Sequence, residues 1–201
     1  SHKYEPNAAD GVDYQGEMGI PRPEGQPALG IGEVDGDYHL ALRHALAPFF
    51  SPGAVEKMKP FMEEQAHRFL DQRIADGQMD LVLDYASPVP AILTMKIMGL
   101  PHDNWHLYAN LFHSVMAVPQ DGEEYKNAIA KVPAMMQEVL EYAATRRAKP
   151  KDDLTSFLIQ FEFNGQRPDD EQLLNILWNL IAGGVDTTTS QTALTLLHLG
   201  T

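Results

Sequence analysis

Apolar residues recur at steps of three and four along most of the chain after residue 37, which is the spacing of one face of an α-helix. The longest such pattern, from Asp169 to Leu199, predicts one buried helix about 46 Å long at ~1.5 Å per residue. Patterns that alternate as in a strand are nearly absent. The pattern therefore predicts a mainly α fold with a long central helix.

The same pattern divides the chain into three regions of one partial domain, without a complete second domain. Residues 1–37 are rich in glycine and proline and lack periodicity, which indicates either a functional lid or part of a larger domain. Residues 38–168 carry a series of helices separated by proline and glycine. Residues 169–199 form the long central helix.

Prolines, glycines and capping carboxylates predict the ends of the shorter helices. We expect one helix from Tyr38 to about Phe50, one from Pro60 to near Gly77, one within Leu81 to Met98, one capped by Asp103, one from about Glu123 to Arg147 interrupted by Pro133, and one capped by Asp152 and Asp153. A turn at Asn164 and Gly165 then leads to the central helix.

The middle of the central helix conflicts with a purely structural role. Gly183 and Gly184 each cost roughly 1 kcal/mol of helix propensity, and Asp186 and the hydroxyls of residues 187–190 follow directly. The glycines would let a flat group approach the backbone, and the hydroxyls can bond to carbonyls one turn earlier, which bends or widens a helix. Asp186 beside Thr187 would form a proton relay. The alternative is a glycine-kinked core helix with satisfied hydroxyls.

The composition excludes several classes of partner and of site. A formal net charge of −13 argues against a nucleic-acid partner, which needs clustered Lys and Arg. The sequence has no uninterrupted apolar run of ~18 residues, so we expect no membrane span and a cytoplasmic protein. It contains no cysteine, so these residues supply neither a disulfide nor a thiolate.

Other side chains carry groups that could bind an anion or a metal, or act as a nucleophile. His39 and Arg43 lie one helical turn apart and could bind a carboxylate or phosphate, although a solvated helix face explains the spacing as well. His102 and His106 share a helix face but lack a third ligand, so a metal site is not expected. No serine, Ser87 included, has the setting of a hydrolase nucleophile.

The run from Ala182 to Thr188, AGGVDTT, resembles the oxygen-binding helix motif of the cytochrome P-450 family, the haem-thiolate monooxygenases. The family's bacterial soluble type also has the pattern Asp-x-x-x-His-x-x-x-Arg, found here from Asp35 to Arg43, followed by a Phe-Ser-Pro ending at Pro52. Residues 79–82 and 98–101 match in order and distance as well. Four ordered matches are far more specific than one.

The resemblance implies a role for each matching residue. His39 and Arg43 would contact the haem propionates, and Ala182, Gly183 and Gly184 would lie over the haem face. Thr187 would bind dioxygen through a hydrogen bond, and Asp186 would relay protons. The cofactor would be haem, reduced indirectly by NAD(P)H through a ferredoxin or flavoprotein. The substrate would be an apolar small molecule, hydroxylated with dioxygen and two electrons.

The sequence also departs from the family pattern. The family's Glu-x-x-Arg helix and haem cysteine are absent, so we expect an internal fragment that holds no metal ligand and is inactive alone. Asp37 stands where the family often has Pro or Glu. A non-catalytic helical scaffold or a domain that binds a lipid-like molecule is the alternative interpretation.

Overall fold

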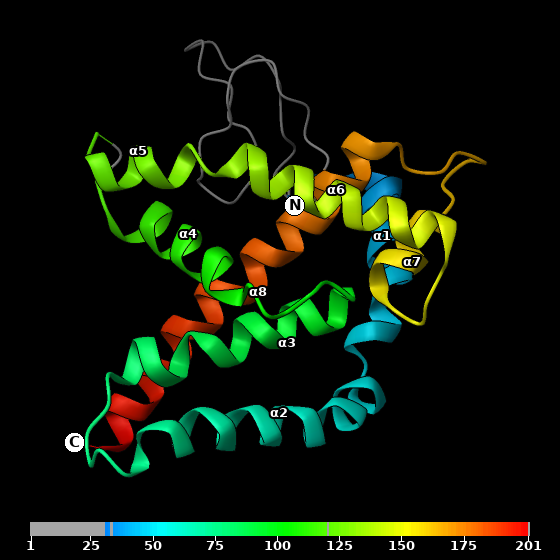
Figure 1. The fold of residues 1–201 in the computed structure, drawn as a ribbon. Helices are drawn as coiled ribbons and strands as arrows, with labels where there is room; N and C mark the ends of the chain where they lie inside the picture. Colours follow the sequence, from blue (N-terminus) through cyan, green and yellow to red (C-terminus); the bar gives the residue numbers. More distant parts are fainter. Residues whose placement is uncertain (1–30, 33, 120, 201) are drawn as a thin grey trace.

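The long central helix is present and begins where the sequence predicts. The computed structural model describes residues 31–32, 34–119 and 121–200, and α8 spans Asp170–Leu199 (Figure 1). Asp169 accepts a hydrogen bond from the Gln172 backbone N–H at 2.8 Å, and the Gln172 side chain accepts from the Asp169 N–H at 3.1 Å. This reciprocal capping box explains locally why the helix begins here.

Shorter helices surround α8. They are α1 Gly36–Leu46, the 3₁₀ turn η1 Ala47–Phe50, α2 Pro52–Ile74, the π-helical turn η2 Leu81–Ala86, α3 Pro88–Met98, α4 Trp105–Ala117, α5 Glu123–Ile129, α6 Val132–Ala148 and α7 Leu154–Gln160. Among the described residues, extended pairing is limited to one bridge between Phe163 and Gln166, across the predicted turn. The mainly α prediction is confirmed.

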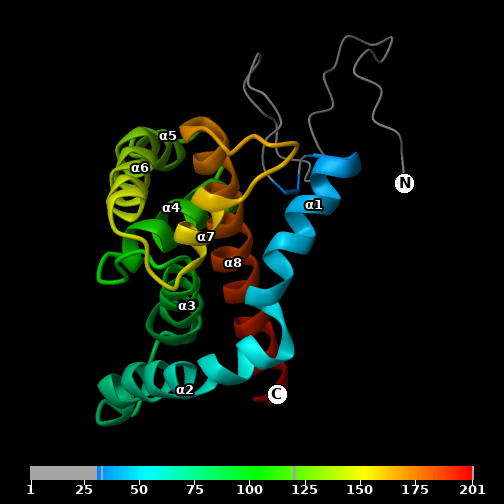
Figure 2. The same ribbon diagram turned by 90° about the vertical axis from the view of Figure 1, so that its right-hand side faces the viewer.

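Helix α8 crosses the middle of the molecule. In Figure 2 it lies between α1 on one side and α3, α4 and α6 on the other. The predicted glycine- and proline-rich region falls mostly in residues 1–30, which lie outside the described residues.

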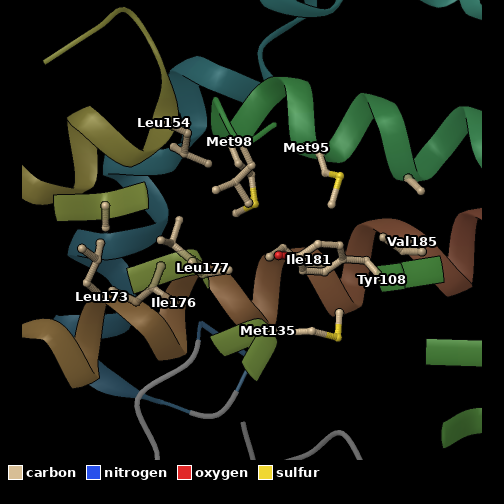
Figure 3. Packing of buried hydrophobic residues seen from close by; sticks show 14 of the residues in the cluster. Met95, Met98, Tyr108, Met135, Leu154, Leu173, Ile176, Leu177, Ile181 and Val185 are labelled. Atoms are coloured by element: carbon tan, nitrogen blue, oxygen red, sulfur yellow. The ribbon is translucent and has the colours of Figure 1, made fainter. Parts of the chain in front are cut away.

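The hydrophobic core gathers where α3, α4, α6 and α7 meet the first half of α8. Five residues of α8 are completely buried: Leu173, Ile176, Leu177, Ile181 and Val185. Figure 3 shows them facing side chains that include Met95 and Met98 of α3 and Met135 of α6. Each fully buried side chain of this size contributes roughly 1.5–3 kcal/mol, so this cluster fixes the position of α8.

Two predicted helix starts are wrong. Helix α2 begins at Pro52, because the Ser51 hydroxyl accepts a hydrogen bond from the Ala54 N–H at 3.3 Å and Pro52 suits the first helical position. Pro60 lies inside α2, where it removes one helical hydrogen bond and its ring crowds the carbonyl four residues earlier. Asp103 does not cap α4, because its side chain is 98% exposed and Asn104 occupies the cap position.

One stretch of the described residues, Leu81–Met98, is long and apolar enough to cross a membrane by length and composition alone. Its second part is α3, where Ile92, Met95 and Met98 are at most 1% exposed. These side chains belong to the core against α8. Burial in the fold therefore accounts for the apolar character of these three residues.

A buried ion pair joins α6 to the start of α7. Arg146 Nε donates to Asp153 Oδ2 at 2.5 Å, and a second guanidinium nitrogen donates to the Gly99 carbonyl at 3.0 Å and to the Tyr142 hydroxyl. The same carboxylate accepts from the Ser156 N–H at 2.8 Å and so caps α7, whereas Asp152 does not. Gly99 has φ +76°, and a Cβ there would overlap Asp153.

Candidate active site on helix α8

From the middle of α8 onward, one strip of the helix surface is no longer covered by the core. Gly183, Thr187, Ser190 and Leu194 follow one another at steps of four, three and four, so they share one side of the helix. All four are exposed, and Leu194 is 62% exposed. Ile176 lies on the same side two turns earlier and is 0% exposed. The side of α8 that is buried in its first half is therefore open from Gly183 onward.

The two glycines have different surroundings. A Cβ at Gly184 would lie 2.5 Å from Thr94 Oγ1 and 3.0 Å from Thr94 Cγ2, so this glycine allows α8 to pack closely on α3. A Cβ at Gly183 would meet nothing within 4 Å. Only Gly183 thus leaves an open surface of the kind that a flat group could approach. Ala182 lies beside it, partly buried against the core.

Two of the four hydroxyls at residues 187–190 make the predicted hydrogen bonds to the preceding turn. Thr187 Oγ1 donates to the Gly183 carbonyl at 2.6 Å, and the buried Thr189 donates to the Val185 carbonyl at 2.9 Å. The expected widening of the helix is absent, since α8 is α-helical throughout Asp170–Leu199. A carbonyl has two lone pairs, so it can accept a hydroxyl as well as its own helical N–H.

The Asp186 carboxylate is held from the neighbouring helices. Asp186 Oδ1 lies 2.5 Å from His113 Nδ1 on α4, and His113 Nε2 lies 3.0 Å from the Ser87 hydroxyl at the start of α3. The side chains of His113 and Asp186 are 22% and 17% exposed. Sequence reasoning missed His113 and the role of Ser87, because no spacing rule links residues so far apart.

The hydroxyl, imidazole and carboxylate stand in the order of a serine hydrolase triad. Ser87, however, is only 3% exposed, so a substrate carbonyl has no access to its oxygen. The arrangement instead fixes the imidazole between two helices. It supports the expectation that no serine here is a hydrolase nucleophile.

His39 and Arg43 stand on α1, on the other side of α8 from α3 and α4 (Figure 2). His39 is half-buried and Arg43 is exposed. Neither forms an ion pair with any residue that the structure describes, and no hydrogen bond joins them to the α8 residues. The His39 imidazole and the Arg43 guanidinium are thus available to an anion, while the buried Leu42 and Leu46 attach α1 to the core.

A metal site made of side chains is not found in residues 31–32, 34–119 and 121–200. No group of three or more His, Asp or Glu residues in this part of the chain could hold a metal ion. His102 lies 4.0 Å from the exposed Asp103, and His106 contacts Trp105. His102 is half-buried and His106 is exposed, within the expectation of surface or half-buried histidines.

A family model described as cytochrome P450 matches residues 77–201, which is more than half of the chain. The chain belongs to the cytochrome P-450 family. The match includes α8 but begins after α1. Membership implies haem as the cofactor, which agrees with the resemblance found in the sequence.

Relatives and solved structures extend the similarity over α1. The chain is 30% identical over 168 residues to a mycinamicin IV hydroxylase/epoxidase of Micromonospora griseorubida, covering 82% of this chain and 41% of the relative. It is 28% identical over 154 residues to the polyketide biosynthesis cytochrome P-450 PksS of Bacillus subtilis, covering 75% and 36%. The chain therefore spans less than half the length of these two relatives.

The fold agrees with this membership. A mutant of P-450 EryK in complex with erythromycin B superposes with a TM-score of 0.70 at 26% identity, covering 83% of this chain and 44% of that one. A myxobacterial P-450 in complex with myristic acid superposes with the same TM-score and identity, covering 80% and 40%. The helices described here are thus the helical part of the cytochrome P-450 fold.

Proposed function

We propose that the protein containing this chain is a haem-dependent monooxygenase that hydroxylates an apolar organic substrate with dioxygen and two electrons. The observation that carries the proposal is the open strip of α8, where Gly183 leaves the backbone uncovered and Thr187 and Asp186 follow within one turn. The mycinamicin IV hydroxylase/epoxidase and a methyl-branched lipid omega-hydroxylase of Mycobacterium bovis are relatives whose named substrates are organic molecules.

The residues present fit a haem. Haem is a flat group with two carboxylates, so it needs an open face and cations. Gly183 supplies an uncovered face on α8, and His39 and Arg43 supply cations that have no ion-pair partner among the described residues. The axial thiolate would come from outside these residues, since the chain has no cysteine. Haem supplies the redox chemistry when bound, and the protein supplies binding, orientation and protons.

Each side chain then has a distinct task. His39 and Arg43 would hold the haem carboxylates through hydrogen bonds, charge-assisted in the case of Arg43. Gly183, with Ala182 beside it, would let a haem face approach α8, whereas Gly184 contributes indirectly by seating α8 on α3. The hydroxyl proton of Thr187 is donated to the Gly183 carbonyl. Its oxygen lone pairs are therefore left to accept a hydrogen bond from water on the open strip.

Asp186 supplies protons beside this acceptor. A carboxyl group exchanges protons readily, and Asp186 is one residue from Thr187 at the edge of the strip. We infer that electrons come from NAD(P)H through a ferredoxin or flavoprotein, and that the protein acts in the cytoplasm. These two inferences rest on the soluble bacterial type of the family.

The test is the haem content and the carbon-monoxide difference spectrum of the reduced full-length protein. We expect bound haem and the Soret band of a thiolate-ligated carbonyl complex. A full-length protein that purified without haem and could not be reconstituted would overturn the proposal. It would favour the non-catalytic helical scaffold instead.

A further inference from the structure

Asp186 uses only one of its two carboxylate oxygens in the structure. Oδ1 is bonded to His113 Nδ1, and Oδ2 has no hydrogen-bond partner among the described residues. We propose that His113 is a positioning residue for Asp186. It holds Oδ1 so that Oδ2 stays available for proton exchange on the strip that carries Thr187. The inference deepens the proposed function and rests on it for its effect on turnover.

Ser87 orients the imidazole for this task. Ser87 stands at the N-cap position of α3, but its side chain makes no capping hydrogen bond. Pro88 and Pro90 occupy the first and third positions of α3 and have no N–H to be capped. The Ser87 hydroxyl is therefore free to bond to His113 Nε2. When this hydroxyl donates to Nε2, the ring proton lies on Nδ1 and points at Asp186.

The three residues come from three different helices, so the carboxylate is fixed by the packing of α3 and α4 on α8. The side chains of His113 and Asp186 are 22% and 17% exposed, so the hydrogen bond lies at the boundary between the core and the open strip. A positioning role explains why the hydrogen bonds from Ser87 through His113 to Asp186 connect α3, α4 and α8 beside the open strip.

The first arm of the test observes the hydrogen bond directly. Full-length protein labelled with ¹⁵N-histidine is examined by NMR as the diamagnetic ferrous carbon-monoxide complex, or without haem if none is bound. We expect His113 to show a strongly downfield Nδ1–H proton that disappears in His113→Gln and in Asp186→Asn and persists in His106→Gln, a control on the same helix. Absence of a resonance that depends on Asp186 overturns the proposal.

The second arm asks whether His113 acts through Asp186, using a double-mutant cycle on the holoenzyme. We expect His113→Gln to lower kcat by about 10-fold, less than Asp186→Asn because the acid remains, with KM and thermal midpoint near those of the wild type. The solvent deuterium isotope effect on kcat should rise, because proton supply becomes slower. In the Asp186→Asn background the same change should have no further effect.

Ser87→Ala provides a milder variant that keeps the imidazole. We expect a smaller loss of kcat in the same direction, again absent in the Asp186→Asn background. Equal losses of kcat from His113→Gln with and without Asp186 would overturn the positioning role. If the protein holds no haem, the proposed function fails, while the resonance still decides whether His113 holds Asp186.

Discussion

Asp153 and Asp186 are two carboxylates at or within neighbouring helices of one core, and they are treated in opposite ways. Asp153 is bonded to the Arg146 guanidinium and to the Ser156 N–H, and only 8% of its side chain is exposed. Asp186 is bonded to His113 through one oxygen, and 17% of its side chain is exposed. The first carboxylate uses both its oxygens in the fold, and the second keeps one available.

The two carboxylates also differ in how their surroundings act on them. Burial alone would raise the pKa of the Asp153 carboxyl, but hydrogen bonds from Ser156 and the Arg146 guanidinium outweigh it and hold the pKa below its ordinary value. Such a carboxylate stays charged and does not exchange protons near neutral pH. Asp186 has an imidazole as its partner and an open strip beside it, where the proposed proton relay would act.

The largest expected effect is a loss of turnover when Asp186, the proposed proton donor, is replaced. Asp186→Asn should lower turnover of the holoenzyme by about 10²- to 10⁴-fold, because an amide cannot deliver the proton. This equals roughly 3–5 kcal/mol of activation free energy. Steady-state turnover checks it, with Asp170→Asn as an exposed control in the first turn of α8. Turnover within twofold of the wild type would remove Asp186 from the mechanism.

Asp153 uses both its carboxylate oxygens within the fold, so removing its partner should lower the free energy of unfolding. Arg146→Met leaves Asp153 charged and buried without a cation, so the free energy of unfolding should fall by about 3–5 kcal/mol. Arg147→Met is the matched control, because Arg147 is the next residue and pairs with Asp170 at the surface. Its effect should stay below about 1 kcal/mol. Urea unfolding of both variants decides, and equal effects would contradict the contrast.

Two adjacent glycines sharpen the comparison near Asp186. Gly184→Ala should destabilise the protein by about 1–3 kcal/mol, because the new methyl group overlaps Thr94. Thr94→Ala should restore much of this loss. Gly183→Ala meets open space and should stabilise the haem-free protein by up to about 1 kcal/mol through helix propensity. Unfolding of the haem-free full-length protein by urea checks all three, and a larger loss at Gly183 would refute the assignment.

The smallest effect expected is the pH dependence that Asp153 contributes. Its pKa is lowered in the folded state, so its share of the stability is fully present above the unfolded value of about 3.9. That share is lost as the pH falls through the lower folded pKa. The difference in unfolding free energy between wild type and Asp153→Asn should therefore shrink below about pH 4. A difference that grew with acidification would show the opposite sign of the shift.

Local signals account for what could be predicted. Helix α8 was predictable because its periodicity, the cap at Asp169 and Gln172 at the third position all lie within the segment itself. Asp186 and Thr187 were predictable as candidates because glycines and hydroxyls conflict with a buried helix. Their catalytic roles stay predictions.

Contacts between distant segments account for what was missed. His113 is 73 residues from Asp186, and nothing in its own surroundings points to a partner on α8. The task of Gly184 depends on Thr94, which the packing of α3 on α8 brings near. The start of α2 was misplaced because Pro52 and Pro60 both suit a first helical turn, and the cap at Ser51 decides between them.

In the proposed function, the strip with Thr187 and Asp186 is where dioxygen is bound and protons are supplied. The most direct measurement is the ratio of product formed to NAD(P)H oxidised in Thr187→Ala and Thr195→Ala of the full-length holoenzyme. Both threonines donate to the carbonyl four residues earlier, at 2.6 and 2.7 Å, so these hydrogen bonds to the helix backbone are matched, and Thr195 also accepts one from Gln191 Nε2 at 3.1 Å. We predict that Thr187→Ala oxidises NAD(P)H with release of peroxide, while Thr195→Ala stays coupled. Equal coupling in the two variants would contradict the claim.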